Sequence, residues 1–229
     1  MVVHTTVPAA PGRLLTLPGV YAPQDDTELL ARALGREAIG PDTDLLDLGT
    51  GSGALAVHAA RLGARVTAVD IARRAVLTAR LNAMVARQRI TVLRGDLTAA
   101  VPGRTYDVVA SNPPYVPSPS VRPPRRGPAR SWDAGQDGRA VVDRICASAP
   151  AVLRPGGVLL LVHSALCDPD ATVRRLAKEG LETTVADQAR IPFGPVLRSR
   201  RSYLRERGML DGEDGEHMEE LVVIRAERT

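Results

Sequence analysis

Short apolar segments alternate with Ala- and Arg-rich helical segments between residues 44 and 111, and this alternation constrains the fold more than any other feature of the chain. Apolar runs of five or six residues are typical of buried strands, whereas apolar residues spaced three or four apart are typical of helices. Strands are predicted at 44–48, 65–70, 90–94 and 106–111, with helices at 54–62 and 71–87. Strands that alternate with helices across short loops favour a single doubly wound α/β sheet.

The segments on either side extend this pattern. A helix is predicted from Asp25, because an acid followed three residues later by Glu28 is similar to a capping box. Further elements are a helix at 140–153, a turn at 154–157, a strand at 158–162, a helix at 168–179 and strands at 181–187 and 220–226. Outside the pattern lie an irregular N-terminal arm at 1–22, a Pro- and Arg-rich loop at 116–138 and an Arg-rich insertion at 190–217. We expect one domain over residues 1–229.

Composition excludes several classes of protein. With 44% hydrophobic and 24% charged residues the chain is neither disordered nor fibrous, and with 3% aromatic residues its core must be filled by Leu, Val and Ala. The net charge of +4 favours acidic partners only weakly. Cys146 and Cys167 lack a CxxC spacing and are expected to be reduced thiols, and four scattered His residues predict no metal site. Because no apolar run is long enough for a membrane span and no signal layout is present, a cytoplasmic protein without membrane contact is expected.

Polar residues follow four of the predicted strands at the point where each strand ends. Asp47 leads into a glycine cluster, and Asn112 leads into a pair of prolines. Asp70 and Asp96 end the two strands in between. Because ligands bind beyond the carboxyl ends of the strands in such sheets, these four ends should line one site.

The glycine cluster predicts a site for a nucleotide-like cofactor. Gly49, Gly51 and Gly53 permit positive φ and close backbone approach, and the helix that follows presents its N-terminus to a polar ligand group. Gly49-x-Gly51-x-x-Ala54 also fits a dinucleotide fingerprint, with Asp70 at the spacing of a ribose-binding acid. A NAD or FAD enzyme therefore stays open on these residues alone.

The acids at the next two strand ends suggest an adenosine group. Asp70 would accept hydrogen bonds from both ribose hydroxyls, and it could at the same time cap the following helix. Asp96 offers an acceptor for an adenine amino group, although a turn or cap explains it equally well. Since the dinucleotide pattern requires no acid at the third strand end, Asp96 favours an adenosine cofactor that lies across the rim of the sheet.

The Asn-Pro-Pro-Tyr sequence at 112–115 is the most specific motif in the chain. Two prolines after a strand form a stiff loop that presents carbonyl acceptors and no N–H donors. Together with the Asn112 side-chain oxygen they can hold both hydrogens of an NH2 group, while Tyr115 can stack on the flat group that bears it. Such a device suits methylation of an amide or aniline-type nitrogen, because holding the hydrogens out of plane leaves the lone pair aimed at the methyl carbon. Catalysis is then mainly positioning and electrostatics.

On these motifs the chain resembles the class I S-adenosylmethionine-dependent methyltransferases that carry Asn-Pro-Pro-Tyr, and within them the compact form of the HemK-type protein glutamine methyltransferases. The likeness runs from Val20 to about Gly208 and resumes at the last strand. Residues 20–30 resemble the family's N-terminal motif, 132–139 the segment after the catalytic loop, and 220–223 the closing strand. The resemblance implies a Rossmann-like α/β fold with a seven-stranded, mostly parallel sheet whose last strand is antiparallel.

The resemblance also implies a cofactor, a substrate and their binding residues. The cofactor would be S-adenosyl-L-methionine, and the methyl acceptor a glutamine in a translation release factor. The cofactor site would be lined by Tyr21, Thr27, Asp47, Gly49, Thr50, Gly51, Asp70, Ile71, Asp96, Leu97 and Asn112. The acceptor amide would be bound by Asn112, Pro113, Pro114 and Tyr115. Some compact relatives work with a small zinc-binding activator subunit, and the residues do not decide whether this chain needs one.

Other functions stay open on the sequence. Adenine-N6 methyltransferases of DNA and RNA share the Asn-Pro-Pro-Tyr motif, so nucleic acid is an alternative acceptor. A small-molecule or peptide-tailoring N-methyltransferase is another alternative. An NAD-dependent oxidoreductase or an inactive cofactor-binding protein would leave the loop at 112–115 without a purpose.

Several features outside the motifs have two interpretations. The arginines of the loop from Arg122 to Arg130 belong either to a lid that contacts an acidic partner such as RNA, or to a solvated loop. A second group of arginines has the spacing of a charged helix face: Arg198, Arg200, Arg201, Arg205 and Arg207. Trp132 is expected to pack beneath the lid or to stack on substrate. His163, at the end of a buried strand, is expected to be a structural histidine with its hydrogen bonds satisfied.

Overall fold

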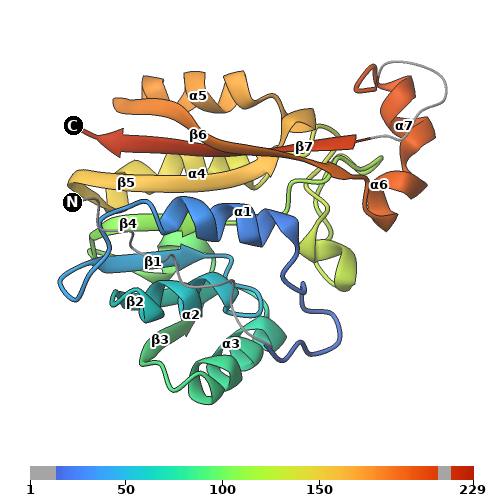
Figure 1. The fold of residues 1–229 in the computed structure, drawn as a ribbon. Coiled ribbons are helices and arrows are strands. Elements are labelled where there is room, and N and C mark those ends of the chain that lie inside the picture. The colour runs from blue at the N-terminus through green and yellow to red at the C-terminus, as the bar shows by residue number, and fades with distance from the viewer. Residues whose placement is uncertain (1–13, 211–217) are drawn as a thin grey trace, which may run out of the picture.

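The computed structural model describes residues 14–210 and 218–229. Here seven strands form one sheet in the order β3-β2-β1-β4-β5-β7-β6 (Figure 1). The strands are β1 (Asp44–Leu48), β2 (Arg65–Asp70), β3 (Ile90–Arg94), β4 (Tyr106–Ser111), β5 (Leu153–Ser164), β6 (Leu181–Pro192) and β7 (Met218–Arg228). The helices are α1 (Asp25–Leu34), α2 (Ala54–Arg61), α3 (Arg73–Val85), α4 (Val142–Ser148), α5 (Pro169–Lys178), α6 (Pro195–Ser199) and α7 (Arg201–Glu206). β1 to β5 pair in parallel and β7 is antiparallel to both β5 and β6, which confirms the predicted sheet.

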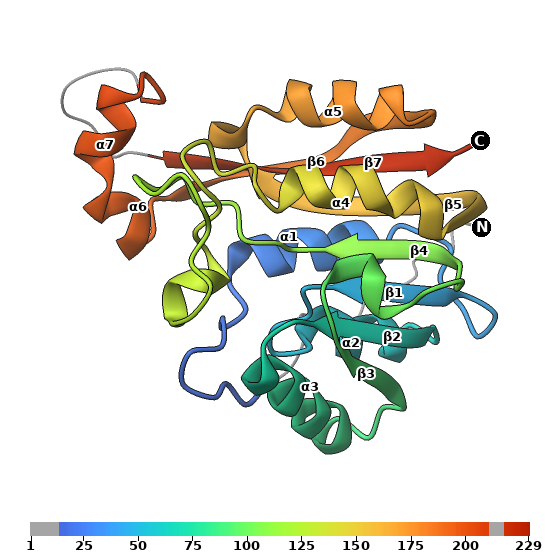
Figure 2. The same cartoon turned by 180° about the vertical axis from the view of Figure 1, so that it is seen from behind.

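Helices cover both faces of the sheet, which explains why its central strands are apolar along almost their whole length. α1 lies in front of the sheet in Figure 1, and α4 lies in front of it in the opposite view of Figure 2. All of β1 except Asp44 is buried, as is all of β4 except Asp107. The core consists mainly of Leu, Val and Ala, as the composition predicts, and the many alanines let the helices pack closely on the strands.

The turn predicted at 154–157 is wrong, because these residues already belong to β5. The pairing of β5 with β4 shifts register between Tyr106 and Val108, so the Pro-Gly-Gly sequence forms an irregularity at the start of a strand. Gly157 is required there: a Cβ atom would lie 3.1 Å from the Tyr106 carbonyl oxygen. A β-bulge of this kind has the same local sequence signature as a turn.

Other predicted bounds also need correction. The helix expected at 140–153 is only α4, followed by a 3₁₀ turn at Ala149–Val152, because Pro150 cannot donate the next helical hydrogen bond. β6 continues to Pro192 and β7 begins at Met218, because each pairs with the other over this length. α1 begins where predicted, but its N-cap is Gln24 and no side chain caps it, so the capping box does not form.

The Arg-rich insertion folds as a small helical appendage instead of one charged helix. Its two helices, α6 and α7, pack around Phe193, Leu197 and Leu204. Arg200 donates to the Pro117 carbonyl at 2.8 Å and forms an ion pair with Asp133 at 2.5 Å, which attaches the appendage to the loop at 116–138. Both segments therefore lie at the carboxyl end of the sheet (Figures 1 and 2). Residues 211–217 of the predicted insertion, like 1–13 of the predicted arm, lie outside the described residues, whereas 14–22 contain neither helix nor strand.

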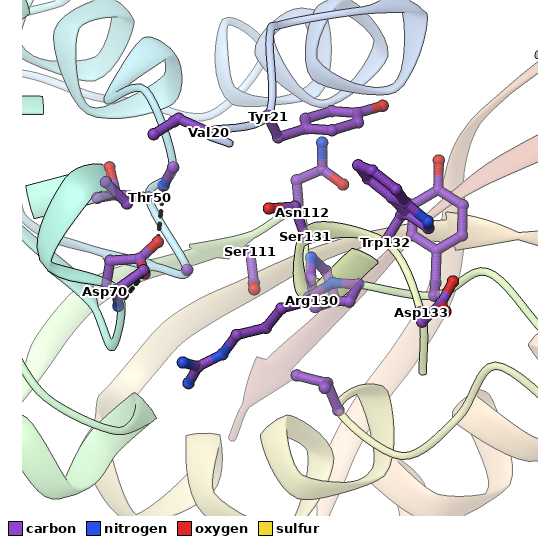
Figure 3. Close-up of a pocket in the computed structure, with 18 of the residues that line it drawn as sticks. Val20, Tyr21, Thr50, Asp70, Ser111, Asn112, Arg130, Ser131, Trp132 and Asp133 are labelled. Atoms are coloured by element: carbon purple, nitrogen blue, oxygen red, sulfur yellow. Dashed lines mark hydrogen bonds between the residues drawn. The ribbon is translucent and has the colours of Figure 1, made fainter. Parts of the chain in front are cut away.

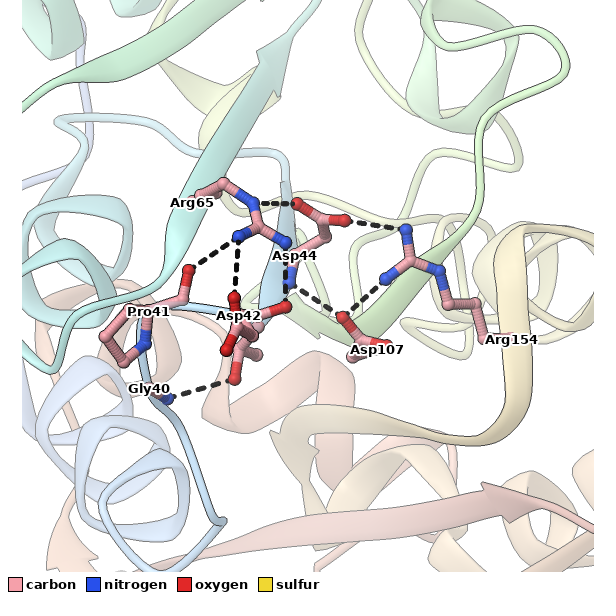
Figure 4. A network of polar contacts seen from close by, with 8 residues as sticks. Gly40, Pro41, Asp42, Asp44, Arg65, Asp107 and Arg154 are labelled. Carbon is pink, nitrogen blue, oxygen red and sulfur yellow. Dashed lines mark hydrogen bonds and ion pairs between the residues drawn. The ribbon is translucent and has the colours of Figure 1, made fainter.

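At the opposite, amino end of the sheet, a network of charges joins four neighbouring strands (Figure 4). The Asp44 carboxylate accepts from Arg65 at 2.8 Å and from Arg154 at 2.6 Å. Arg154 also contacts Asp107 at 2.6 Å, and Asp107 in turn accepts from the Asp44 backbone N–H at 2.8 Å. These residues come from β1, β2, β4 and β5, so the network holds the amino ends of these strands together. The opposite, carboxyl ends of the strands carry the site.

Within the described residues, Cys146 and Cys167 are both buried and unpaired. No described helix combines the length and the apolar character that crossing a membrane requires.

Candidate active site

A cavity of about 910 Å³ opens at the carboxyl end of the sheet (Figure 3). Its walls come from segments far apart in the sequence: the N-terminal arm, the glycine turn, the ends of β2 to β4, the loop at 116–138, α4 and the start of α6. Three of the four predicted strand-end residues, Asp70, Asp96 and Asn112, thus line the cavity. The fourth strand end contributes its glycine turn to the wall, but not Asp47 itself.

The glycine turn exposes its backbone to the cavity. Gly49, Gly51 and Gly53 have φ of 74°, 55° and 82°, a region that residues with a Cβ rarely adopt. At Gly53 a Cβ would also lie 3.0 Å from Ala79, so this glycine permits α2 to pack against α3. Thr50, which the resemblance assigns to the cofactor, lines the wall beside these glycines.

Asp70 connects the end of β2 to the glycine turn. Its Oδ2 accepts from the Gly51 N–H at 3.0 Å and its Oδ1 from the Ala72 N–H at 2.8 Å. Burial raises the pKa of this carboxyl, and the two N–H donors oppose that rise. A carboxylate has about four acceptor positions, so both oxygens can accept further hydrogen bonds from a ligand in the cavity. Ile71 continues the same wall.

Asp47 is placed differently from the other predicted cofactor residues. It does not line the cavity but lies behind the glycine turn, completely buried. The Thr50 hydroxyl donates to its Oδ2 at 2.6 Å, and its Oδ1 has no hydrogen-bond partner among the described residues. Burial raises the pKa of Asp47 to about 7. Its part in cofactor binding stays a prediction, and the geometry indicates an indirect part, through Thr50.

Asp96 and Leu97 line the cavity on the side of α4. Asp96 forms an ion pair with Arg144 at 2.8 Å, and Leu97 adopts a left-handed conformation with φ of 47°. Arg130 extends from the loop at 116–138 toward Asp70 (Figure 3). Sequence reasoning missed Arg144 and gave Arg130 only a possible lid role, because only the folded structure shows that these positions on α4 and on the loop face the cavity.

The loop at 112–115 is connected to the N-terminal arm by a chain of hydrogen bonds. Asn112 Nδ2 donates to Thr27 Oγ1 at 3.3 Å. The hydroxyls of Tyr115 and Tyr21 both donate to Asp26 Oδ2, at 3.0 and 2.9 Å. The predicted residues Tyr21 and Thr27 are therefore brought to the acceptor loop, and all four residues of that loop line the cavity. Asp26, which sequence reasoning assigned to a helix start, is instead the acceptor that positions two tyrosines.

The segment after this loop turns back to cover it. Val116 forms a bridge to Asp133, with the Val116 N–H donating to the Trp132 carbonyl at 2.7 Å. Trp132 is half-buried and lines the cavity close to Asn112, so packing and substrate stacking are both compatible with its position (Figure 3). Gly138 makes this arrangement possible: a Cβ there would overlap the Tyr115 carbonyl oxygen.

A second buried carboxyl reaches the cavity from β7. Glu219 is 6% exposed and lines the wall, and burial raises its pKa to about 7. It lies 107 residues after Asn112, and no motif in the sequence marks it.

Outside the cavity wall, the described residues offer no further group placed for direct chemistry. His163 is buried away from the cavity wall, with Nδ1 2.9 Å from the Ser164 carbonyl oxygen, and burial lowers its pKa to about 4. Its Nε2 has no partner in the described part of the chain, so the histidine is structural but only half of its hydrogen bonds are satisfied. The same residues contain no group of three or more His, Cys, Asp or Glu side chains that could hold a metal ion.

A glycine turn after β1, acids after β2 and β3, and Asn-Pro-Pro-Tyr after β4, all on a seven-stranded sheet with an antiparallel last strand, define a class I methyltransferase. Residues 11–122 match the family model described as Methyltransferase small domain. The chain is 31% identical over 181 residues to a Methanocaldococcus jannaschii protein named "Putative protein N5-glutamine methyltransferase", covering 79% of this chain and 90% of that protein. This chain belongs to the family of protein N5-glutamine methyltransferases.

One further relative agrees with the family, and one solved structure shares the fold. The release factor glutamine methyltransferase of Gloeobacter violaceus is 38% identical over 193 residues, which cover 76% of this chain but only 65% of that protein. This chain thus spans less than two thirds of the length of the Gloeobacter relative. The E. cuniculi Mtq2–Trm112 complex, described as methylating the termination factor eRF1, shares the fold with a TM-score of 0.65 at 24% identity, covering 92% of this chain and 99% of that chain.

Proposed function

We propose that this protein transfers a methyl group from S-adenosyl-L-methionine to the side-chain amide nitrogen of a glutamine, in a protein substrate of the release-factor type. The observation that carries the proposal is that the Asn-Pro-Pro-Tyr loop and the glycine turn wall the same cavity. A cofactor bound along the turn therefore faces an acceptor bound at the loop. The relatives named as glutamine methyltransferases support the choice of acceptor.

The wall residues fit S-adenosyl-L-methionine, which when bound supplies an activated methyl group. Asp70 retains free acceptor positions for ribose hydroxyls, since its backbone donors occupy only part of the carboxylate. Asp96, beside Arg144, would accept from the adenine amino group. The glycine backbone, Thr50 and Ile71 would line the nucleoside, and Tyr21 and Thr27 would border the methionine end.

Asn112 and the two prolines would hold the acceptor amide. The Asn112 amide donates through Nδ2 to Thr27, which orients its side-chain oxygen as an acceptor. The carbonyl groups of a proline-containing loop cannot turn away easily, because proline fixes φ. Both hydrogens of the NH2 group can then be held while the nitrogen lone pair points toward the methyl carbon, so the chain contributes mainly position and orientation.

A protein acceptor is favoured over nucleic acid by the family to which the chain belongs. The Mtq2–Trm112 complex also supports a small activator subunit as part of the proposal. The decisive measurement is transfer of labelled methyl from S-adenosylmethionine to a release factor, with and without a Trm112-type protein. A Gln→Ala release factor and mixed DNA and RNA serve as parallel acceptors. Label that disappears with the Gln→Ala change supports the proposal, and label only on nucleic acid overturns the choice of acceptor.

Two variants separate the halves of the site. Asn112→Ala should reduce turnover by roughly 100-fold or more and leave the cofactor Kd within a few-fold, because it acts on the acceptor. Asp70→Ala should weaken cofactor binding by roughly 1.5–3 kcal/mol, as expected for hydrogen bonds to a charged group. Cofactor Kd by calorimetry and steady-state turnover measure both. An Asn112→Ala variant with near-normal turnover would contradict the proposed mechanism.

A further inference from the structure

Glu219 is a buried carboxyl on the acceptor side of the cavity. It is 6% exposed, whereas its neighbours Met218 and Glu220 on the same strand are exposed. Alternate residues of a strand point to opposite faces, so Glu219 alone of the three points inward. At the end of β7 that borders the cavity, the side chain that points inward is therefore an ionisable one, that of Glu219.

Strand order places Glu219 away from the proposed cofactor end. Asp70 and the glycine turn follow β2 and β1, Asn112 follows β4, and Glu219 begins β7, two strands beyond β4 on the other side. Neighbouring strands lie roughly 4.8 Å apart, so β7 is offset sideways from β4 by about 10 Å, in the direction away from the glycine turn. Ser111 and Ile224 both pair with Leu161, so Glu219 also lies beyond the end of β4 along the strand direction.

The surroundings of Glu219 provide few donors. The Ser164 hydroxyl at the end of β5 opposes the rise in the pKa of the carboxyl, and Oε1 has no hydrogen-bond partner in the described residues. The other titratable groups that face it are Asp26 on α1, Tyr21 on the arm, Tyr115 on the acceptor loop and Cys167 after β5. Its pairing partner on β6, Ile191, is apolar. Among the described residues no cation contributes to the pKa of Glu219, so the unpartnered oxygen is suited to accept from a ligand that brings an N–H group.

We propose that Glu219 is a specificity-determining residue of the acceptor site, which accepts a hydrogen bond from a main-chain N–H of the substrate peptide next to the methylated glutamine. This inference rests on the proposed function and adds to it. Only three carbon–carbon bonds separate the amide carbon of a glutamine from its α-carbon. The proposed cofactor occupies the side of the glycine turn, so we place the peptide backbone on the opposite side of Asn112, toward β7, where Glu219 lies.

Protonation should control this contact. Burial and Asp26 raise the pKa of Glu219 to about 7, so the carboxylate, the better acceptor, forms as pH rises through 7. The KM for the protein acceptor should therefore fall between about pH 6 and pH 8. The cofactor Kd should not follow this change.

The test compares three variants of the full chain on a release-factor substrate. Glu219→Ala removes the acceptor oxygens, Glu219→Gln retains an oxygen of the same shape but does not titrate, and Glu220→Gln is the matched control on the exposed face. We expect Glu219→Ala to raise the acceptor KM roughly 10-fold or more, with the cofactor Kd within twofold. Glu219→Gln should raise it less and abolish the pH dependence, and Glu220→Gln should resemble the wild type.

Three results would overturn the inference. The acceptor KM could be unchanged in both Glu219 variants. The cofactor Kd could rise in parallel with KM, which would assign Glu219 to the cofactor end. The pH dependence could persist in Glu219→Gln. If the wild-type protein itself transfers no methyl group to a release factor, the proposed function fails first, which distinguishes the two failures.

Discussion

Asp47 is a buried carboxyl directly behind the glycine turn that, among the described residues, faces no cation and has one oxygen without a partner. Taking an unpaired charge out of water is costly, so the protonated form is favoured in the folded state and the pKa rises from 3.8 to about 7. Such a group binds a proton more tightly in the folded than in the unfolded protein. Its contribution to stability is therefore lost as pH rises from about 4 to about 7.

This predicts the behaviour of Asp47→Asn, which cannot ionise. The free energy of unfolding of the variant, minus that of the wild type, should grow between pH 5 and pH 7 by at most about 1.4 kcal/mol per pH unit and then stay constant. Urea unfolding of both proteins at pH 5, 6, 7 and 8 measures this difference. Contributions from other titrating groups, such as His163, are the same in both proteins and cancel in the difference. Asp42→Asn, at a fully exposed side chain, is the control. A difference that is flat over the whole range would refute the account of Asp47.

Residue by residue, the sequence predicts those parts of the site that a local motif marks. Asp70, Asn112 and Tyr115 were found because each ends or follows a strand with a recognisable pattern. Asp26 was placed only in a helix start and in the N-terminal motif, because its contact with the distant Tyr115 cannot be seen in the local sequence. Glu219 and Arg144 could not be found at all, since their burial and direction depend on how distant elements pack.

Among the elements, strands were predicted better than the segments between them. β1 to β4 have the predicted bounds because each is a buried apolar run between clear breaks. β6 and β7 were both predicted too short, because the two strands stabilise one another beyond the point where their own sequences suggest strand. The start of β5 was missed for a similar reason: Pro155 and Gly156 indicate a turn, and only pairing with β4 makes the segment part of a strand.

The charge network at the amino end of the sheet allows a prediction about these strands. Arg65 and Arg154 lower the pKa of Asp44, so its contribution to stability is present above pH 3.8 and is lost as pH falls through the lower value in the folded protein. Because the side chains are partly exposed, Asp44→Asn should cost only about 1 kcal/mol at pH 7. Thermal or urea unfolding should show this cost at pH 7 and a clearly smaller one near pH 3. An equal cost at both pH values would mean that packing, not charge, is what the substitution removes.

On the scale of the whole molecule, two arginine-rich segments lie beside the mouth of the cavity. The loop at 116–138 contributes the exposed Arg122, Arg125 and Arg126, and the helical appendage is attached to it through Arg200 and Asp133. The interpretation of a lid that contacts an acidic partner stays a prediction. Its position at the entrance, with Arg125 in the cavity wall, is what such a lid requires.

If this face attracts an acidic surface of the protein substrate, the acceptor KM of the wild type should rise between about 50 and 200 mM salt. The triple variant Arg122→Gln, Arg125→Gln, Arg126→Gln should have a higher KM at low salt and a weaker salt dependence. A control with the same change of charge, at Arg61, Arg87 and Arg89, uses exposed arginines far from the cavity. If the acceptor KM depends equally on salt in the wild type, the triple variant and the control, the loop is a solvated segment that does not contact the substrate. Inhibition of the wild type by added RNA would instead indicate a nucleic-acid partner.

The position of β7 has a consequence for how the protein is made. β7 is the last strand in sequence, yet it lies between β5 and β6, which do not pair with each other. During synthesis β6 therefore leaves the ribosome before the strand that attaches it to the sheet, and the nascent chain has open edges on both β5 and β6. Because Glu219 arrives with the same strand, the cavity wall is completed in the step that closes these edges. Under the proposed function, a newly made chain would therefore gain its complete acceptor site only once β7 has left the ribosome and paired with β5 and β6.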